Sequence, residues 1–198
     1  MSSESQRKKI VILASGAGSV AQALIDAVQK SSGALHARIR IARVISENSD
    51  AGILQRADAA GIPATHIEFR GGDARPEWEL RLRNAIADEN PWLVVSAGFM
   101  KILSPEFVRQ FRIINTHPSL LPLFPGAHAV RDALAAGAGK SGCTLHYVDE
   151  GVDTGAIIAQ REIAIEPGET EEHLHERIKV LERELLVTGI LSLLEEDK

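Results

Sequence analysis

The sequence is poor in the features that mark several specialised classes of protein. It has one cysteine in 198 residues, which excludes disulfides within the chain and a zinc site built from cysteines. Acidic residues outnumber basic ones by 27 to 22, so the basic excess that favours nucleic-acid binding is missing. We therefore expect a protein of a reducing compartment that does not bind nucleic acid.

Long apolar runs are also missing. No run approaches the roughly 20 apolar residues that a membrane-spanning helix needs. The first nine residues, MSSESQRKK, lack the apolar core of a signal peptide. We expect a cytoplasmic protein with no membrane partner and a flexible tail over residues 1–7. The length fits a single domain over residues 1–198.

What is present in the first half is an alternation of strand and helix patterns. Short apolar runs are typical of buried strands, and the amphipathic stretches between them are typical of helices. The strand-like runs lie at 9–14, 39–46, 64–69, 92–97 and 112–114. Repeated strand–helix units predict an α/β fold with a mostly parallel, Rossmann-like sheet and helices on both faces.

The second half has a different pattern. Residues 142–148 and 156–163 are strand-like and flank a glycine-rich loop, which predicts an antiparallel pair. Cys143 falls within the first of these strands, where a core position is expected. A long C-terminal helix should follow, with Thr170 as its N-cap. Its buried face is predicted to hold Leu174, Ile178, Leu181 and Leu185.

The first candidate site is the Ser15–Ser19 turn between the first strand and the first helix. Glycines let a backbone approach a phosphate, and a helix N-terminus offers unpaired N–H groups and a positive dipole end. A tight turn without a ligand is the alternative. A whole dinucleotide is disfavoured, because Glu47 and Asp50 lie nearer thirty than twenty residues beyond the glycines.

The second and third candidates are two polar loops. Asn115 and His117 precede a proline, and an amide and an imidazole two residues apart can face one pocket. Asn can donate to an oxyanion, and His can move a proton near neutral pH. The alternative is a histidine that only forms a hydrogen bond within its loop. The loop from Asp149 to Gly155 is either a simple turn or weak cation site, or the source of a carboxylate that reaches His117 and favours its charged form. His128 and His146 are further candidates for lining this pocket.

These segments resemble one family throughout. IVILASGAGS (10–19), SAGFMKILSPEFV (96–108), INTHPSLLPLFPGAHAV (114–130), GCTLHYVDEGVDTGAIIAQ (142–160) and HERIKVLERELL (175–186) are similar to the folate-dependent glycinamide ribonucleotide formyltransferases of purine synthesis. The resemblance covers about residues 8–194. Its most specific element combines Asn-x-His-Pro-Ser-Leu-Leu-Pro with Asp-x-Gly.

The resemblance implies a role for each matching position. The implied catalytic residues are Asn115, His117 and Asp153. The implied ribonucleotide contacts are Gly18, Ser19, Val20, Gly98, Lys179 and Glu182. The implied folate contacts are Arg75, Met100, Lys101, Ile102, Leu103, Asn115, Val148, Asp149 and Asp153. Three positions depart from common members: Val20 replaces Asn, Lys101 replaces Arg, and Lys179 replaces Gln.

The implied reaction is direct formyl transfer from the cosubstrate 10-formyltetrahydrofolate to a substrate amine, without a metal. Two alternatives stay open. The first is a 10-formyltetrahydrofolate hydrolase, whose members share the trio but carry an additional N-terminal domain. The second is a nucleotide-binding protein that uses only the glycine-rich loop. The resemblance also leaves a homodimer open.

Overall fold

The computed structural model describes residues 7–69 and 74–197. The chain forms two compact units, Met1–Ile113 and Ile114–Lys198. Apart from Arg7, the predicted tail at residues 1–7 lies outside the described residues. A single domain over the whole chain stays a prediction.

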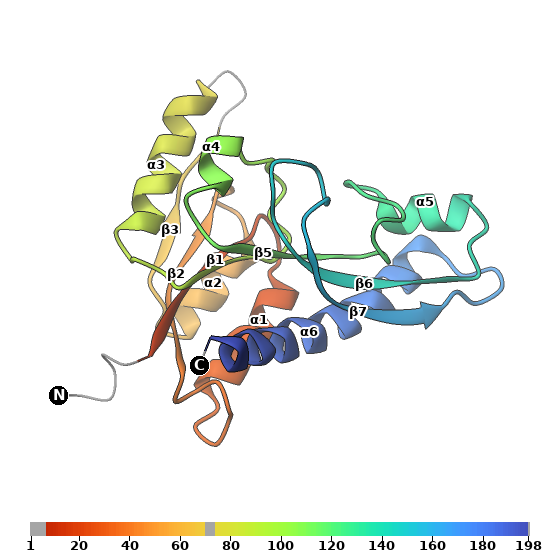
Figure 1. Ribbon diagram of the computed structural model, residues 1–198, viewed down its shortest axis with the longest axis horizontal. Helices are drawn as coiled ribbons and strands as arrows, with labels where there is room; N and C mark the ends of the chain where they lie inside the picture. The colour runs from red at the N-terminus through yellow and green to blue at the C-terminus, as the bar shows by residue number, and fades with distance from the viewer. Residues whose placement is uncertain (1–6, 70–73, 198) are drawn as a thin grey trace. The chain divides into compact units, whose positions relative to one another are not determined.

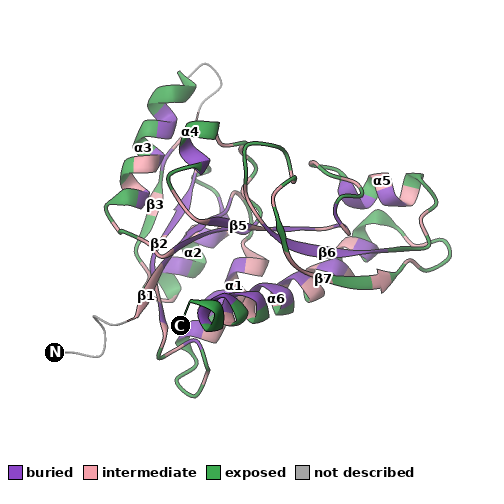
Figure 2. Ribbon diagram, in the orientation of Figure 1, coloured by how far each residue is buried: buried purple, intermediate pink, exposed green. Residues whose placement is uncertain are grey.

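The first unit contains parallel strands in the order β3-β2-β1-β4. Figure 1 labels β1, β2 and β3 of this unit. The central strand β1 is buried on both faces, and Ile10 to Leu13 have no exposed surface. Figure 2 shows the buried residues running along β1 and β2. The bounds are β1 Lys8–Leu13, β2 Ile39–Ser46, β3 Ala64–His66 and β4 Leu93–Ser96. β3 is shorter than the predicted run at 64–69 because ladder pairing stops at His66.

The first helix has the apolar spacing of an amphipathic helix. The buried face of α1 consists of Ala21, Leu24, Ile25 and Val28, which lie at the i, i+3, i+4 and i+7 positions of one helical face. Helix α3 is anchored by Trp78, whose buried Nε1 donates to the carbonyl of Ile67 at 2.9 Å. The bounds are α1 Ser19–Gln29, α2 Gly52–Ala59, α3 Arg75–Ala87 and α4 Pro105–Val108.

The second unit contains antiparallel strands in the order β5-β6-β7, with two helices. Thr170 caps the long helix α6, as predicted, by accepting a hydrogen bond from the backbone N–H of His173 at 3.2 Å. One predicted position on its buried face is wrong: Leu181 is half-buried, and Glu182 is buried instead. The bounds are β5 Ile113–His117, α5 Ala129–Ala135, β6 Lys140–Tyr147, β7 Ile157–Ala164 and α6 Glu171–Glu196.

The two faces of β6 have different neighbours. Leu145 packs on Gly189 of α6, where an added Cβ would lie 2.1 Å from Leu145 Cδ2. Successive side chains of a strand alternate between faces, so Thr144 and His146 point away from α6. Thr116 of β5 is opposite Leu145 in the ladder, and Asn115 is opposite His146. This register separates an α6 face from a face that carries Asn115, His117 and His146.

The predicted α/β class is confirmed, with parallel strands first, antiparallel strands in the C-terminal half and a long last helix. Within the described residues, every helix is too short or too polar to cross a membrane.

Candidate active site

The glycine-rich turn leads directly into α1. Gly18 is the N-cap residue of α1 and has a left-handed φ of 72°. A Cβ at Gly18 would lie 2.6 Å from Ile53 Cβ, so α1 and the start of α2 can approach closely only because this residue is glycine. Ser19 and Val20 begin the helix and are half-buried. The backbone N–H groups of this first turn have no partner within the helix and can bind an anion.

Gly18→Ala is expected to lower the free energy of unfolding by about 2 kcal/mol, because alanine is strained at positive φ and its Cβ overlaps Ile53. Gly16→Ala is the matched control in the same turn, since nothing lies within 4 Å of its added Cβ. Urea denaturation of both variants measures the difference. Equal effects of the two substitutions would contradict this account of Gly18.

The loops after β1 and β4 are joined by two hydrogen bonds. The Ser15 N–H donates to the Gly98 carbonyl at 3.0 Å, and the Met100 N–H donates to Ser15 Oγ at 2.7 Å. Gly98 has φ 76°, a conformation that favours glycine. The structure therefore brings Gly98 and Met100 to the start of the glycine-rich turn.

Two of the predicted folate residues of the first unit, Arg75 and Lys101, lie near Phe69, a residue that the sequence did not indicate. The Arg75 guanidinium carbon lies 5.7 Å from the Phe69 ring centroid, and Lys101 Nζ lies 5.3 Å from it. Phe69 and Lys101 also line a pocket of about 390 Å³. The remaining lining residues are Ser15, Glu47, Asn48, Ser49, His66 and Glu68.

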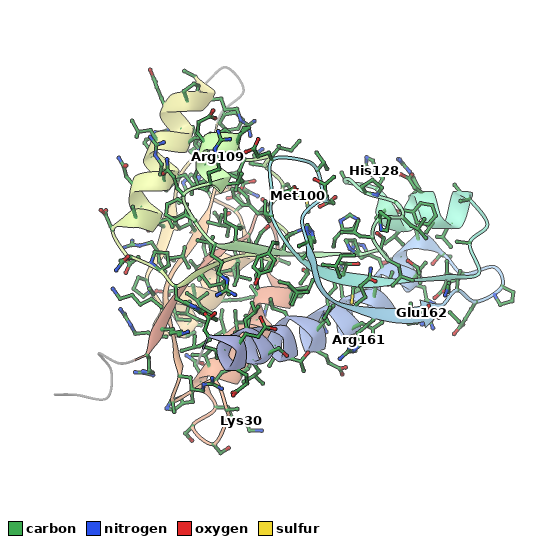
Figure 3. All side chains as sticks on the ribbon, in the orientation of Figure 1. Lys30, Met100, Arg109, His128, Arg161 and Glu162 are labelled. Atoms are coloured by element: carbon green, nitrogen blue, oxygen red, sulfur yellow. The ribbon has the colours of Figure 1, made fainter. Side chains whose placement is uncertain are left out.

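Two apolar side chains flank Lys101 and are unusually exposed. Met100 is 70% exposed and Ile102 is 66% exposed, whereas Leu103 is half-buried. Figure 3 labels Met100 on the loop that follows β4. Exposed apolar residues beside a cation can contact a ligand that has both a flat apolar part and carboxylates.

In the second unit, β5 extends further than expected. The predicted strand at 112–114 ends before Asn115, but β5 continues to His117 because Asn115, Thr116 and His117 pair with β6. Asn115 and His117 therefore project from a fixed ladder on the face away from α6. His117 is 4% exposed and Asn115 is half-buried.

Asp153 supplies the carboxylate of this face. Its Oδ2 lies 3.3 Å from His117 Nδ1 and accepts the Gly126 N–H at 2.8 Å. Its Oδ1 lies 3.6 Å from His146 Nε2. Asp153 has a left-handed φ of 55°, which non-glycine residues adopt rarely and which recurs at functional sites. The contact between Asp153 and His117 is thus present, while the catalytic roles stay predictions.

Both ring nitrogens of His117 face acceptors. Nε2 lies 2.9 Å from the Phe124 carbonyl, which can only accept a hydrogen bond. Nδ1 faces the Asp153 carboxylate. A doubly protonated, positively charged ring satisfies both partners.

The two other candidate histidines, His146 and His128, differ in burial. His146 is 2% exposed, and its Nε2 lies 3.2 Å from Asn115 Nδ2. His128 is an exposed residue at the N-cap position of α5, and Figure 3 labels it there. Only His146 joins the cluster of Asn115, His117 and Asp153.

The predicted ribonucleotide residues of α6 lie on the other face of the β5–β6 ladder. Glu182 is 5% exposed, and burial raises the pKa of its carboxyl to about 7, against the opposing effects of a Thr116 hydrogen bond and the nearby Lys179 and Arg183 charges. Lys179 Nζ is 2.6 Å from Glu176 Oε1. The structure therefore does not bring this pair together with the His117 cluster.

The loop after β6 is held by its own hydrogen bonds. Asp149 Oδ1 accepts the Thr154 hydroxyl at 2.7 Å and the Gly151 N–H at 3.1 Å. Val148 is half-buried beside it. These hydrogen bonds hold Thr154 against Asp149, and they thereby restrict the position of Asp153, the residue before Thr154.

Within the described parts of the chain, one group of side chains has the spacing of a metal site: Glu166, Glu169 and His173. Glu169 already accepts two hydrogen bonds from Arg177 Nη1, at 2.7 and 2.9 Å. Glu169 Oε1 also lies within hydrogen-bonding distance of His173 Nδ1, at 2.8 Å. These contacts are an ion-pair network at the start of α6.

Comparisons with known proteins identify the family and agree with the fold. Residues 8–190 match the Formyl transferase family. The chain is 45% identical over 187 residues to phosphoribosylglycinamide formyltransferase of Mycobacterium tuberculosis (strain CDC 1551 / Oshkosh), covering 93% of this chain and 84% of that protein. It is 44% identical over 201 residues to the trifunctional purine biosynthetic protein adenosine-3 of Drosophila pseudoobscura pseudoobscura, covering 97% of this chain and 15% of that protein. The solved phosphoribosylglycinamide formyltransferase of Brucella melitensis is 36% identical, with a TM-score of 0.86, and the match covers 94% of this chain and 95% of that one.

Proposed function

This chain belongs to the formyl transferase family, and we propose that it transfers the formyl group of 10-formyltetrahydrofolate to the amine of glycinamide ribonucleotide in purine biosynthesis. The observation that carries the proposal is the buried cluster in which Asp153 Oδ2 lies 3.3 Å from His117 Nδ1, with Asn115 on the same strand face. The 45% identity to a phosphoribosylglycinamide formyltransferase supports the choice of acceptor.

The chemistry needs an acid–base unit and an oxyanion donor, because the substrate amine is its own nucleophile. The amine nitrogen forms a bond to the formyl carbon, and the formyl oxygen becomes an oxyanion. When this tetrahedral intermediate collapses, the bond from the formyl carbon to folate N10 breaks. The attacking nitrogen loses a proton, and N10 gains one, through water.

Asn115 and protonated His117 would stabilise the oxyanion, while Asp153 keeps His117 oriented and charged. Donors aimed at a developing oxyanion typically contribute about 3 kcal/mol each. In the described structure His117 Nε2 donates to the Phe124 carbonyl. Substrate binding would replace that partner, since catalytic hydrogen bonds often tighten only in the substrate complex.

The substrate contacts divide by chemical type. The N–H groups at Gly18, Ser19 and Val20 suit the phosphate because they point outward from the start of a helix. Val20 has no polar side chain, so these backbone groups carry the contact. A carboxylate such as that of Glu182 suits ribose hydroxyls.

The folate contacts would come from both charged and apolar groups. Arg75 and Lys101 provide two cations near Phe69 for the carboxylates of the folate tail. Exposed Met100 and Ile102 provide apolar surface for its flat rings. The loop with Val148, Asp149 and Asp153 would contact the pteridine.

A formyl-transfer assay tests the proposal. Purified protein is mixed with 10-formyltetrahydrofolate, and tetrahydrofolate formation is followed by absorbance with and without glycinamide ribonucleotide. We expect product only when the ribonucleotide is present. Release of free formate without it would assign the chain to the hydrolases, and no reaction in either mixture would overturn the proposal.

A further inference from the structure

His146 contacts two of the three proposed catalytic residues, Asn115 and Asp153. It is directly opposite Asn115 in the β5–β6 ladder, on the face away from α6. Its Nε2 lies 3.2 Å from Asn115 Nδ2 and 3.6 Å from Asp153 Oδ1. A buried imidazole that contacts two such groups has to be protonated on a definite nitrogen.

The hydrogen bonds identify that nitrogen. His146 Nδ1 lies 2.9 Å from the carbonyl of Tyr147, which only accepts, so Nδ1 carries a proton. In the neutral ring Nε2 then has a lone pair and is an acceptor. Asn115 presents its Nδ2 amide group to this lone pair.

We propose that His146 is a positioning residue whose neutral, Nδ1-protonated ring anchors the NH₂ end of the Asn115 amide and so sets the direction in which Asn115 donates to the reacting formyl oxygen. The role in donation rests on the proposed function. A flipped amide would place Asn115 Oδ1 against the Nε2 lone pair, which is a repulsive contact. His146, which is opposite Asn115 in the ladder, therefore fixes an orientation of the amide group that the asparagine side chain does not fix by itself.

Protonation of His146 reverses the contact. Nε2–H can no longer accept from Asn115 and turns to Asp153 Oδ1, the carboxylate that also holds His117. The charged groups that face the ring are Asp153 and Asp149, which favour its charged form, and His117, which opposes it. Burial outweighs them and, despite the Tyr147 hydrogen bond, lowers the pKa of His146 below its usual value. The neutral ring is thus the working form at neutral pH.

The tautomer can be observed without any assay of activity. NMR of protein labelled with nitrogen-15 at histidine distinguishes the two ring nitrogens. At pH 8 we expect a neutral His146 with its proton on Nδ1, and a shift of the Nε2 resonance in Asn115→Ala. A proton on Nε2 at that pH would overturn the proposal, even if the chain formylated another acceptor.

Two substitutions separate positioning from packing. His146→Gln keeps an acceptor near the place of Nε2, whereas His146→Asn is too short to reach it. We expect His146→Asn to lower kcat about tenfold or more with little change in KM. Because protonation of His146 breaks its contact with Asn115, kcat of the wild type should fall at acid pH. His146→Gln should retain most of kcat at neutral pH and lack the part of this fall that comes from His146. Equal losses in both variants, with the pH profile of the wild type, would mean that His146 only fills space.

Discussion

Asp153→Asn is expected to lower kcat by about a hundredfold or more, on the scale of an acid–base contribution, while the protein stays folded. Asparagine is among the few residues that tolerate left-handed backbone, so it suits the φ of 55° at this position. Its Oδ1 can still accept the Gly126 N–H. The neutral amide no longer compensates a charge on His117, however, so the protonated ring loses its partner.

Initial rates at saturating substrates, together with the melting temperature, measure this effect. Glu150→Gln is the matched control, because it removes one carboxylate from an exposed position of the same loop. We expect the control to turn over like the wild type. Near wild-type turnover in Asp153→Asn would remove Asp153 from the proposed mechanism.

Much of the fold could be predicted because its local patterns agree with its packing. The face of α1 and the cap of α6 follow from apolar spacing and from one hydroxyl. β5 was underestimated because Asn115, Thr116 and His117 are polar. What makes them a strand is the ladder with β6, a partner about 30 residues away that no local pattern reveals.

The site could be predicted only in part. A resemblance names positions, but it cannot give the contacts between them. The contact of a second imidazole, that of His146, with Asp153 depends on how the loop after β6 folds, and the position of Phe69 depends on how α3 packs. Spacing along the sequence also does not give the place of a residue in the sheet. Glu47 lies 29 residues after Gly18 because residues 30–38 precede β2, but it still lies directly after the end of β2.

Glu182 was expected only as a ligand contact, and its burial has a consequence for stability. It occupies a core position of α6 where the apolar pattern predicted Leu181. A buried carboxyl without a full set of partners favours its neutral form. Because the pKa of Glu182 rises from 4.5 to about 7 on folding, the folded chain binds this proton more tightly than the unfolded chain does.

The sign of the effect on stability follows from linkage. The contribution of Glu182 is fully present below pH 4.5 and is lost as the pH rises to about 7, because folding then requires either proton uptake or a buried charge. The loss corresponds to about 3 kcal/mol of unfolding free energy. We expect Glu182→Gln to remove this decline, so that the variant gains stability relative to the wild type as the pH rises.

Urea denaturation at intervals from pH 4.5 to pH 8 measures the decline in each protein. Glu184→Gln is the control, since Glu184 is an exposed carboxylate on the same helix, and its curve should parallel that of the wild type. If Glu182→Gln also parallels the wild type, the Glu182 carboxylate is ionised in the folded protein at little cost. In that case Thr116, Lys179 and Arg183 together offset the burial, and the carboxylate is ready to accept ribose hydroxyls without first releasing a proton.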